Sequence, residues 1–289
     1  MTGSPAQAPI DDPRARWVRE PPRYFKGCTS SPTTLFDSDT MAEHFPLRLA
    51  DSRMLAPSVR HMAFERADGT PFAFVPGQFL QIHFSYADGK PTKRSYSVAT
   101  IGAGDGSPVQ RIEMAVSYVD GGAATELLGN LQPGQSVDAS GPYGRFCLMD
   151  PDVNRRYLLV ATGTGVTPYR AMLPQLKVLM AARNVHVALV YGARNEDELL
   201  YGDEFEAFAR ENPLFQFYAC LSRAPRALPR PHDRNGHVQV ALDELKPDPA
   251  HDIAYLCGNP NMVDQAFVLL KEAGLPIPHI RREKYVSSR

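Results

Sequence analysis

A glycine-rich segment in the second half of the chain has the composition of a phosphate-binding turn. It runs Thr162-Gly-Thr-Gly-Val-Thr-Pro168 and leads into a helical stretch. Gly163 and Gly165 permit tight turning and close approach of the backbone. Thr167 could cap the helix, and Pro168 suits its first turn, where exposed amides bind anions. A plain turn between a strand and a helix is the alternative, because Pro168 replaces the third glycine of the G-x-G-x-x-G fingerprint.

Small and polar residues also follow the other apolar stretches of this half. The stretches end at Thr162, Tyr191-Gly192, Ser222-Arg223 and Cys257-Gly258. Open parallel sheets bind ligands at the carboxyl ends of their strands, so these residues are expected to converge. Ser222 and Arg223, with Arg226, Arg230 and Arg234 behind them, offer a hydroxyl and guanidinium groups to a phosphate, such as the 2′-phosphate of NADP. The alternative is an ordinary basic surface loop.

The first half holds a second set of residues suited to a nucleotide. In Arg94-Ser-Tyr-Ser97, an extended strand would place Arg94 and Tyr96 on the same face. This pairing suits a flavin nucleotide, with the guanidinium on the pyrophosphate and the phenol ring beside the flavin. Gly121-Gly-Ala-Ala-Thr125, at a predicted helix start, offers backbone amides and a hydroxyl to the same pyrophosphate.

The elements that must position these residues differ between the two halves. From about residue 45 to 149, short alternating segments separated by Gly, Pro and Asp turns predict an antiparallel barrel. The predicted strands are 45–49, 59–65, 79–84, 94–99 and 111–118, with one short helix at 123–131.

After Pro151 the pattern changes to apolar runs that alternate with helical stretches. Strands are predicted at 157–161, 185–191, 214–221, 253–257 and 279–285, with helices at 168–182, 197–210 and 260–273. This alternation is typical of βαβ crossovers and a parallel sheet. The fold class is therefore β followed by α/β, in three parts: an N-terminal extension at 1–44, a barrel domain at 45–150 and a Rossmann-like α/β domain at 151–289.

Composition excludes several classes of function. The 289 residues carry 31 Lys and Arg against 32 Asp and Glu, so a net charge of −1 argues against a nonspecific nucleic-acid binder. Apolar runs fall far short of the roughly 20 residues that cross a bilayer. The first residues do not resemble a secretion signal, so a cytoplasmic location is expected. The basic stretch of the extension is interpreted as a solvated arm, with docking of an acidic partner as the alternative.

The four cysteines, at 28, 147, 220 and 257, are not spaced like metal or iron–sulfur ligands. No metal site is predicted, and redox chemistry is expected to use an organic cofactor or a partner's metal.

Six motifs in order resemble the ferredoxin–NADP⁺ reductase family. The resemblance covers about residues 45 to 289. The motifs are Arg94-Ser-Tyr-Ser97, Gly121-Gly-Ala-Ala-Thr125, Gly141-Pro-Tyr-Gly144, Thr162-Gly-Thr-Gly-Val-Thr-Pro168, Cys257-Gly-Asn-Pro260 and Glu283-Lys-Tyr285.

The resemblance implies an FAD-binding barrel and an NADP-binding α/β domain, with hydride passing from nicotinamide to flavin N5 and electrons leaving singly to a protein carrier. It assigns FAD binding to Arg94, Ser95, Tyr96, Ser97, Gly121, Gly122, Ala123, Ala124, Thr125 and Tyr285. It assigns NADP binding to Thr162, Gly163, Thr164, Gly165, Pro168, Ser222, Arg223, Arg230, Cys257 and Gly258.

The resemblance also implies catalytic roles for Ser97, Cys257, Glu283 and Tyr285. Ser97 would lie near N5, Cys257 against the nicotinamide, and Glu283 near the flavin edge. Tyr285 would cover one flavin face and yield before nicotinamide approaches. In plant-type members the aromatic residue is terminal, whereas here residues 286–289 follow it. Without the family, Cys257 and Tyr285 would be interpreted as buried core residues.

The expected function is an enzyme that exchanges electrons between NADPH and a ferredoxin or flavodoxin, acting as a monomer. One alternative is the reductase component of an oxygenase system that uses NADH or NADPH with a separate iron–sulfur protein. Another, from a different class, is a flavin-binding sensory or structural subunit. A yellow protein whose flavin absorption is bleached by NADPH would favour either enzyme over the sensory or structural subunit.

Overall fold

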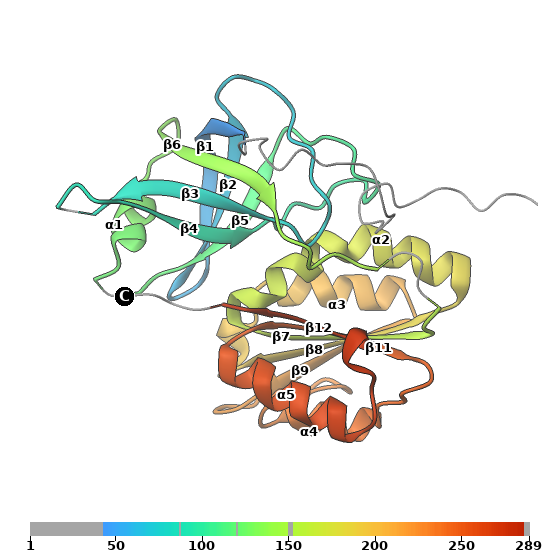
Figure 1. Ribbon diagram of the computed structural model, residues 1–289. Coiled ribbons are helices and arrows are strands. Elements are labelled where there is room, and N and C mark those ends of the chain that lie inside the picture. The colour runs from blue at the N-terminus through green and yellow to red at the C-terminus, as the bar shows by residue number, and fades with distance from the viewer. Residues whose placement is uncertain (1–42, 87, 120, 150–152, 286–289) are drawn as a thin grey trace, which may run out of the picture.

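The computed structural model describes residues 43–86, 88–119, 121–149 and 153–285, and these form two sheets with their helices (Figure 1). The predicted extension at 1–44 lies outside the described residues, except for Glu43 and His44. No helix within the described residues is long and apolar enough to cross a membrane.

The first sheet is antiparallel and six-stranded, in the order β4-β3-β6-β1-β2-β5. Its strands are β1 (His44–Ala56), β2 (Val59–Arg66), β3 (Phe79–Ser85), β4 (Pro91–Ser97), β5 (Ile112–Ser117) and β6 (Ser136–Tyr143). Just past β4, the Ala99 N–H donates a hydrogen bond of 2.7 Å to the Glu113 carbonyl oxygen of β5. This bond brings the two edge strands together and curls the sheet toward a barrel. The predicted helix is α1 (Ala123–Asn130).

Strand β6 was not predicted, although it lies in the middle of this sheet between β1 and β3. Its sequence, Ser136-Val-Asp-Ala-Ser-Gly-Pro-Tyr143, is mostly small and polar and contains a proline, which strand patterns rarely include. Val137 and Ala139 nevertheless point into the barrel core. The neighbouring strands supply the apolar area that β6 lacks.

The second sheet is parallel, in the order β10-β9-β8-β7-β11-β12. Its strands are β7 (Arg156–Thr162), β8 (His186–Ala193), β9 (Phe215–Leu221), β10 (Arg234–Asn235), β11 (Asp252–Gly258) and β12 (Ile280–Lys284). The helices are α2 (Thr167–Arg183), α3 (Gly202–Glu211), α4 (Val238–Leu245) and α5 (Pro260–Glu272). The predicted fold class, an antiparallel barrel followed by a Rossmann-like domain, is confirmed.

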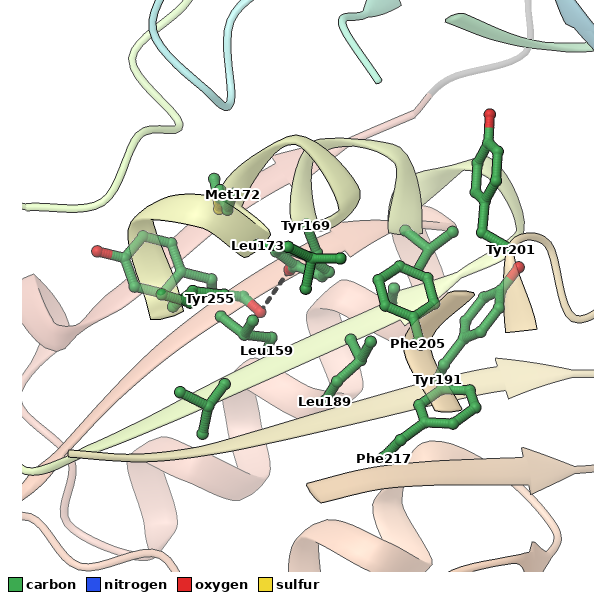
Figure 2. Packing of buried hydrophobic residues seen from close by; sticks show 14 of the residues in the cluster. Leu159, Tyr169, Met172, Leu173, Leu189, Tyr191, Tyr201, Phe205, Phe217 and Tyr255 are labelled. Carbon is green, nitrogen blue, oxygen red and sulfur yellow. Dashed lines mark hydrogen bonds between the residues drawn. The ribbon is translucent and has the colours of Figure 1, made fainter. Parts of the chain in front are cut away.

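Helices cover both faces of the parallel sheet, with α2 and α3 toward the first sheet and α4 and α5 on the opposite side (Figure 1). Alternation along β7 supplies both cores: Tyr157 and Leu159 pack with α2 and α3, while Leu158 and Val160 pack with α4 and α5. Figure 2 shows the first of these cores around Leu159.

Helix α2 is tied to the sheet by a buried phenol. The Tyr169 hydroxyl lies 2.7 Å from the Tyr255 carbonyl oxygen, as drawn in Figure 2, and 3.0 Å from that of Val160. Strand β11 and strand β7 are thereby linked to the first turn of α2. The start of α2, where the glycine-rich segment ends, is held in a fixed position over the sheet.

Two helical predictions differ from the structure. A single helix was expected at 197–210, but a short 3₁₀ turn at Glu196–Glu198 precedes α3, which begins at Gly202. Helix α4 was not predicted, because its eight residues follow a loop rich in proline and arginine.

Candidate functional site

A first cavity of about 510 Å³ opens between β4, the start of α1 and the end of β12. It gathers most of the predicted FAD residues from three separate parts of the chain. Its lining includes Arg94, Ser95, Tyr96, Ser97, Gly122, Ala123, Ala124, Thr125, Thr164, Thr167, Glu283 and Tyr285. Gly121 precedes this set without lining the cavity itself. Phe79, Lys93 and Ser117 also line the cavity and were not predicted.

Arg94 brings a positive charge to this cavity. Its guanidinium donates to the Tyr86 hydroxyl at 3.2 Å and to the Lys93 carbonyl at 2.9 Å, and lies over the Phe84 ring. Among the described residues it has no carboxylate partner, so none of these residues neutralises its charge. An unneutralised guanidinium in a cavity suits an anionic ligand.

Tyr96 and α1 complete that end of the cavity. Tyr96 is half-buried, and burial raises the pKa of its phenol to about 12, so the ring stays neutral. Helix α1 begins after Gly122 without a side-chain cap, which leaves its first amides available. The Thr125 hydroxyl accepts the Val119 N–H at 2.8 Å, so it shapes the turn, and its own proton stays available to donate.

A second cavity, of about 610 Å³, lies over the carboxyl ends of the parallel strands. It is lined by Thr162, Gly163, Thr164, Gly192, Arg194, Ser222, His237, Gln239, Gly258, Asn259 and Tyr285, among others. Gly165 lies beneath it, where a Cβ would come within 2.3 Å of the Cys257 carbonyl oxygen. A Cβ on Gly258, at φ 125°, would lie 2.5 Å from the Thr162 carbonyl oxygen. Glycine at these two positions lets the turn pack directly on β11.

Tyr285 separates the two cavities and lines both. Its N–H donates to the Gly258 carbonyl at 2.8 Å, and its hydroxyl makes a short hydrogen bond with the Ser97 hydroxyl. The residue that directly follows β12 of the second sheet therefore contacts the end of β4 in the first.

Glu283 lies beside this pair. The Ser97 hydroxyl donates to its carboxylate at 3.5 Å. Burial raises the pKa of Glu283 to about 7, so its carboxyl group exchanges a proton near neutral pH.

Cys257 pairs in register with Glu283 across β11 and β12. Its side chain is fully buried, contacts Tyr285 and is not part of either cavity wall. Burial raises the pKa of the thiol well above its usual value, so the group is neutral. Its contact with a nicotinamide stays a prediction.

The predicted phosphate cluster is divided in the structure. Ser222 lines the second cavity, and Arg223 follows it on the exposed surface. Arg226 and Arg230 instead face Glu206, at 2.5 and 3.0 Å, and Arg234 pairs with Glu244. Arg230 therefore lies outside the second cavity, and its role in NADP binding stays a prediction. Arg194, which directly follows β8, lines the cavity and was missed, although strand ends were the signal used for Ser222.

Thr167 does not cap α2, contrary to the sequence interpretation. It is the first residue of the helix, after Val166, and its side chain makes no capping bond. Pro168 follows it in the first turn and is buried. The cap is absent because a capping residue must precede the helix in an extended conformation, whereas Val166 before Thr167 already has helical dihedral angles.

Comparisons with known proteins agree with this architecture. Residues 46–147 match the oxidoreductase FAD-binding domain and residues 159–267 match the oxidoreductase NAD-binding domain. Ferredoxin--NADP reductase B of Sorangium cellulosum is 40% identical over 252 residues, which are 84% of this chain and 98% of that protein. The toluate 1,2-dioxygenase electron transfer component of Pseudomonas putida is 27% identical, over 86% of this chain and 70% of its own.

Solved structures share the fold. The cytochrome P450 reductase GcoB of Amycolatopsis has a TM-score of 0.71 at 28% identity, over 84% of this chain and 69% of its own. A ferredoxin NADP+ reductase from Neisseria gonorrhoeae, solved with FAD and NADP, has a TM-score of 0.70 at 21% identity, over 84% of this chain and 99% of its own.

Fold, site and similarity together define an oxidoreductase with an FAD-binding domain and a nicotinamide-nucleotide-binding domain. Within that class, the chain belongs to the ferredoxin–NADP reductase family. The predicted family and the predicted flavin and nicotinamide cofactors are confirmed.

Proposed function

We propose that the protein transfers electrons between NADPH and a one-electron protein carrier, a ferredoxin or flavodoxin, through FAD bound in the first cavity. The single observation that carries this proposal is the junction of the two cavities at Tyr285, beside Ser97 and Glu283. A ligand in each cavity would meet at this junction. The name of the Sorangium relative supports NADP and ferredoxin as the substrates.

The residues of the first cavity fit FAD. The unneutralised guanidinium of Arg94 and the uncapped start of α1 would hold the pyrophosphate, and the neutral Tyr96 ring would lie beside the flavin. When bound, FAD takes electrons from a nicotinamide in a pair and releases them singly.

The residues of the second cavity fit a nicotinamide dinucleotide. The turn at 163–166 and Gly258 present backbone groups to it, and Ser222 with the exposed Arg223 that follows it would meet the 2′-phosphate. Arg194 also lines the cavity, but its guanidinium is paired with Glu198. The neutral thiol of Cys257, which interacts with the Tyr285 hydroxyl, would help to position this residue rather than react.

At the junction, Ser97 would orient the flavin ring, and Glu283 would exchange a proton with it through Ser97. Ser97 links the Tyr285 hydroxyl to the Glu283 carboxyl group. With a pKa of about 7, that carboxyl group accepts or gives up a proton at neutral pH. Tyr285 would move aside for the nicotinamide to reach the flavin.

A second candidate is the reductase component of an oxygenase system. The similarity to the toluate dioxygenase component and to GcoB favours it. Both candidates share the two cavities, and they differ in the protein that takes the electrons. The expected monomeric state and cytoplasmic location stay predictions of the sequence.

A steady-state assay tests the proposal. The purified protein is expected to be yellow, to be bleached by NADPH, and to reduce cytochrome c only when a ferredoxin or flavodoxin is added. A yellow protein that reduces only an oxygenase's iron–sulfur protein would support the second candidate. A colourless protein that cannot be reconstituted with FAD would contradict both enzyme candidates and favour a subunit without catalytic activity.

A further inference from the structure

An ion pair lies in the wall of the second cavity, directly after β8. Arg194 and Glu198 both line this cavity, and their side chains meet in two parallel contacts, from Nε to Oε2 at 2.6 Å and from Nη2 to Oε1 at 2.5 Å. Among the described residues that line the second cavity, these two are the only arginine and the only carboxylate. The one guanidinium in this wall is therefore already neutralised.

The pair comes from a segment that lies against the residues expected to meet the 2′-phosphate. The Arg194 carbonyl accepts the N–H groups of Arg223 at 2.9 Å and of Ala224 at 3.2 Å. One residue earlier, the Ala193 carbonyl accepts the Ser222 N–H at 3.0 Å. Since Arg194 and Ser222 also line the same cavity, the ion pair and the predicted phosphate site are neighbours.

Glu198 is held by its backbone, independently of the ion pair. Its carbonyl accepts the Leu200 N–H at 3.1 Å and lies 3.3 Å from the buried Tyr191 hydroxyl, which is also 3.1 Å from the Gly163 carbonyl oxygen. The side chain of Glu198 is 24% exposed, against 51% for that of Arg194. The carboxylate is thus carried by a fixed backbone, and a glutamine at this position would keep all of these backbone contacts.

A carboxylate in this position opposes the binding of a phosphate. It occupies guanidinium donors that could otherwise bind phosphate oxygens, and its charge repels the phosphate. NADH has a hydroxyl group where NADPH has the 2′-phosphate, and a carboxylate can accept a hydrogen bond from that hydroxyl. Glu198 is therefore expected to disfavour NADPH relative to NADH.

We propose that Glu198 limits the preference of the enzyme for NADPH, because its carboxylate holds the Arg194 guanidinium away from the 2′-phosphate. Ser222 and Arg223 favour NADPH, Glu198 opposes them, and the protein oxidises both nucleotides. This inference rests on the proposed function, because it requires the dinucleotide to bind in the second cavity. Glu198 acts through Arg194 and is a positioning residue.

Glu198→Gln tests the proposal, because it removes the charge and keeps the shape of the side chain. The ratio of kcat/KM for NADPH to kcat/KM for NADH, measured with ferricyanide as the electron acceptor, is expected to rise about 1.5- to 5-fold, which is the range that an exposed ion pair accounts for. Isothermal titration calorimetry gives a readout without turnover. Adenosine 2′,5′-bisphosphate should bind the variant more tightly by the same factor, whereas adenosine 5′-monophosphate, which lacks only the 2′-phosphate, should bind both proteins alike.

Asp197→Asn is the matched control. Asp197 precedes Glu198 in the same turn and is exposed, so this variant removes the same charge, but Asp197 does not line the second cavity. Its ratio should stay at the wild-type value. A double variant, Glu198→Gln with Arg194→Ala, has the net charge of the wild type and no guanidinium at this place, so it should lose the gain of the single variant.

Three results would overturn the inference. One is an unchanged ratio in Glu198→Gln, and another is an equal rise in Asp197→Asn, which would reflect net charge alone. The third is a gain that persists in the double variant, which would show that the guanidinium plays no part. A wild-type protein that oxidises neither nucleotide would instead contradict the proposed function, so the two failures are distinguishable.

Discussion

Glu283 shows how burial alone changes the chemistry of one side chain. Its carboxyl group lies in the wall of the first cavity, and burial raises its pKa to about 7. An unfolded glutamate titrates at about 4.3. The folded protein thus binds more protons than the unfolded chain between these values, so its stability falls as pH rises through this window.

Glu283→Gln removes this titration. The thermal midpoint of the variant should exceed that of the wild type by an amount that grows from pH 5 to about pH 7 and is constant above it. Differential scanning calorimetry across pH 5 to 8.5 measures this difference. Glu272→Gln, which removes one carboxyl group at the exposed end of α5, is the matched control for the change of net charge. Parallel curves for Glu283→Gln and wild type would show that Glu283 titrates normally.

Arg223 tests the assignment of the 2′-phosphate. Arg223→Ala should lower kcat/KM for NADPH by about 10- to 150-fold, while kcat/KM for NADH stays nearly constant, because a charge-assisted hydrogen bond contributes about 1.5–3 kcal/mol. Arg234→Ala, where the guanidinium pairs with Glu244, should change neither value greatly. Equal losses with both nucleotides in Arg223→Ala would refute the assignment.

At the scale of the element, the turn at 163–166 depends on two glycines for different reasons. Gly165 needs space, because a Cβ would overlap the Cys257 carbonyl of β11. Gly163 needs conformational freedom, since its φ is +55° but its surroundings are open. Within this turn, close packing therefore requires glycine at one position, Gly165, and a left-handed backbone favours it at the other, Gly163.

Alanine substitutions should distinguish these two requirements. Gly163→Ala should cost about 1–2 kcal/mol from its left-handed conformation. Gly165→Ala should cost more, because the overlap forces the turn away from β11 and displaces the start of α2. Urea unfolding monitored by far-UV circular dichroism measures the free energy of unfolding of both variants. If Gly165→Ala is as stable as Gly163→Ala, the backbone of β11 can move to accommodate the added Cβ at little cost, which would contradict this prediction.

At the scale of the whole molecule, a buried charge network joins the two sheets. Arg170 of α2 binds Glu113 of β5 and Glu204 of α3, each at 2.6 Å, and also the Ala99 carbonyl. Nearby, His61 of β2 lies 3.0 Å from the Tyr201 hydroxyl. Burial lowers the pKa of His61, so the ring is largely neutral in this network.

Arg170→Met should therefore destabilise the whole molecule. Removing the guanidinium leaves the Glu113 carboxylate with Arg111, at 3.3 Å, as its remaining arginine partner and also breaks the bond to the Ala99 carbonyl, at a cost of up to about 3–5 kcal/mol. The exposed pair of Arg48 with Glu65 provides a control, since Arg48→Met should cost less than about 1 kcal/mol. Thermal unfolding measures both. Equal effects would show that the network does not hold the sheets together.

The sequence by itself determined the local elements and the chemical types at their ends. Periodicity placed most strands and helices, and Gly163, Gly165 and Arg94 have the types that their conformations and surroundings require. It missed β6, whose polar and small residues give a weak strand pattern, and α4, which is short although its apolar residues Val238, Ala241 and Leu242 have helical spacing. Local patterns report only contacts between residues close in sequence.

Tertiary structure alone decided which of those residues meet. It joined Tyr285 to Ser97 and divided the arginines after β9 between the surface and Glu206. These outcomes depend on the relative positions of two sheets, and contacts such as those of Arg170 set these positions across long separations in sequence. Burial, which raises the pKa of Glu283, likewise arises only when the sheets come together.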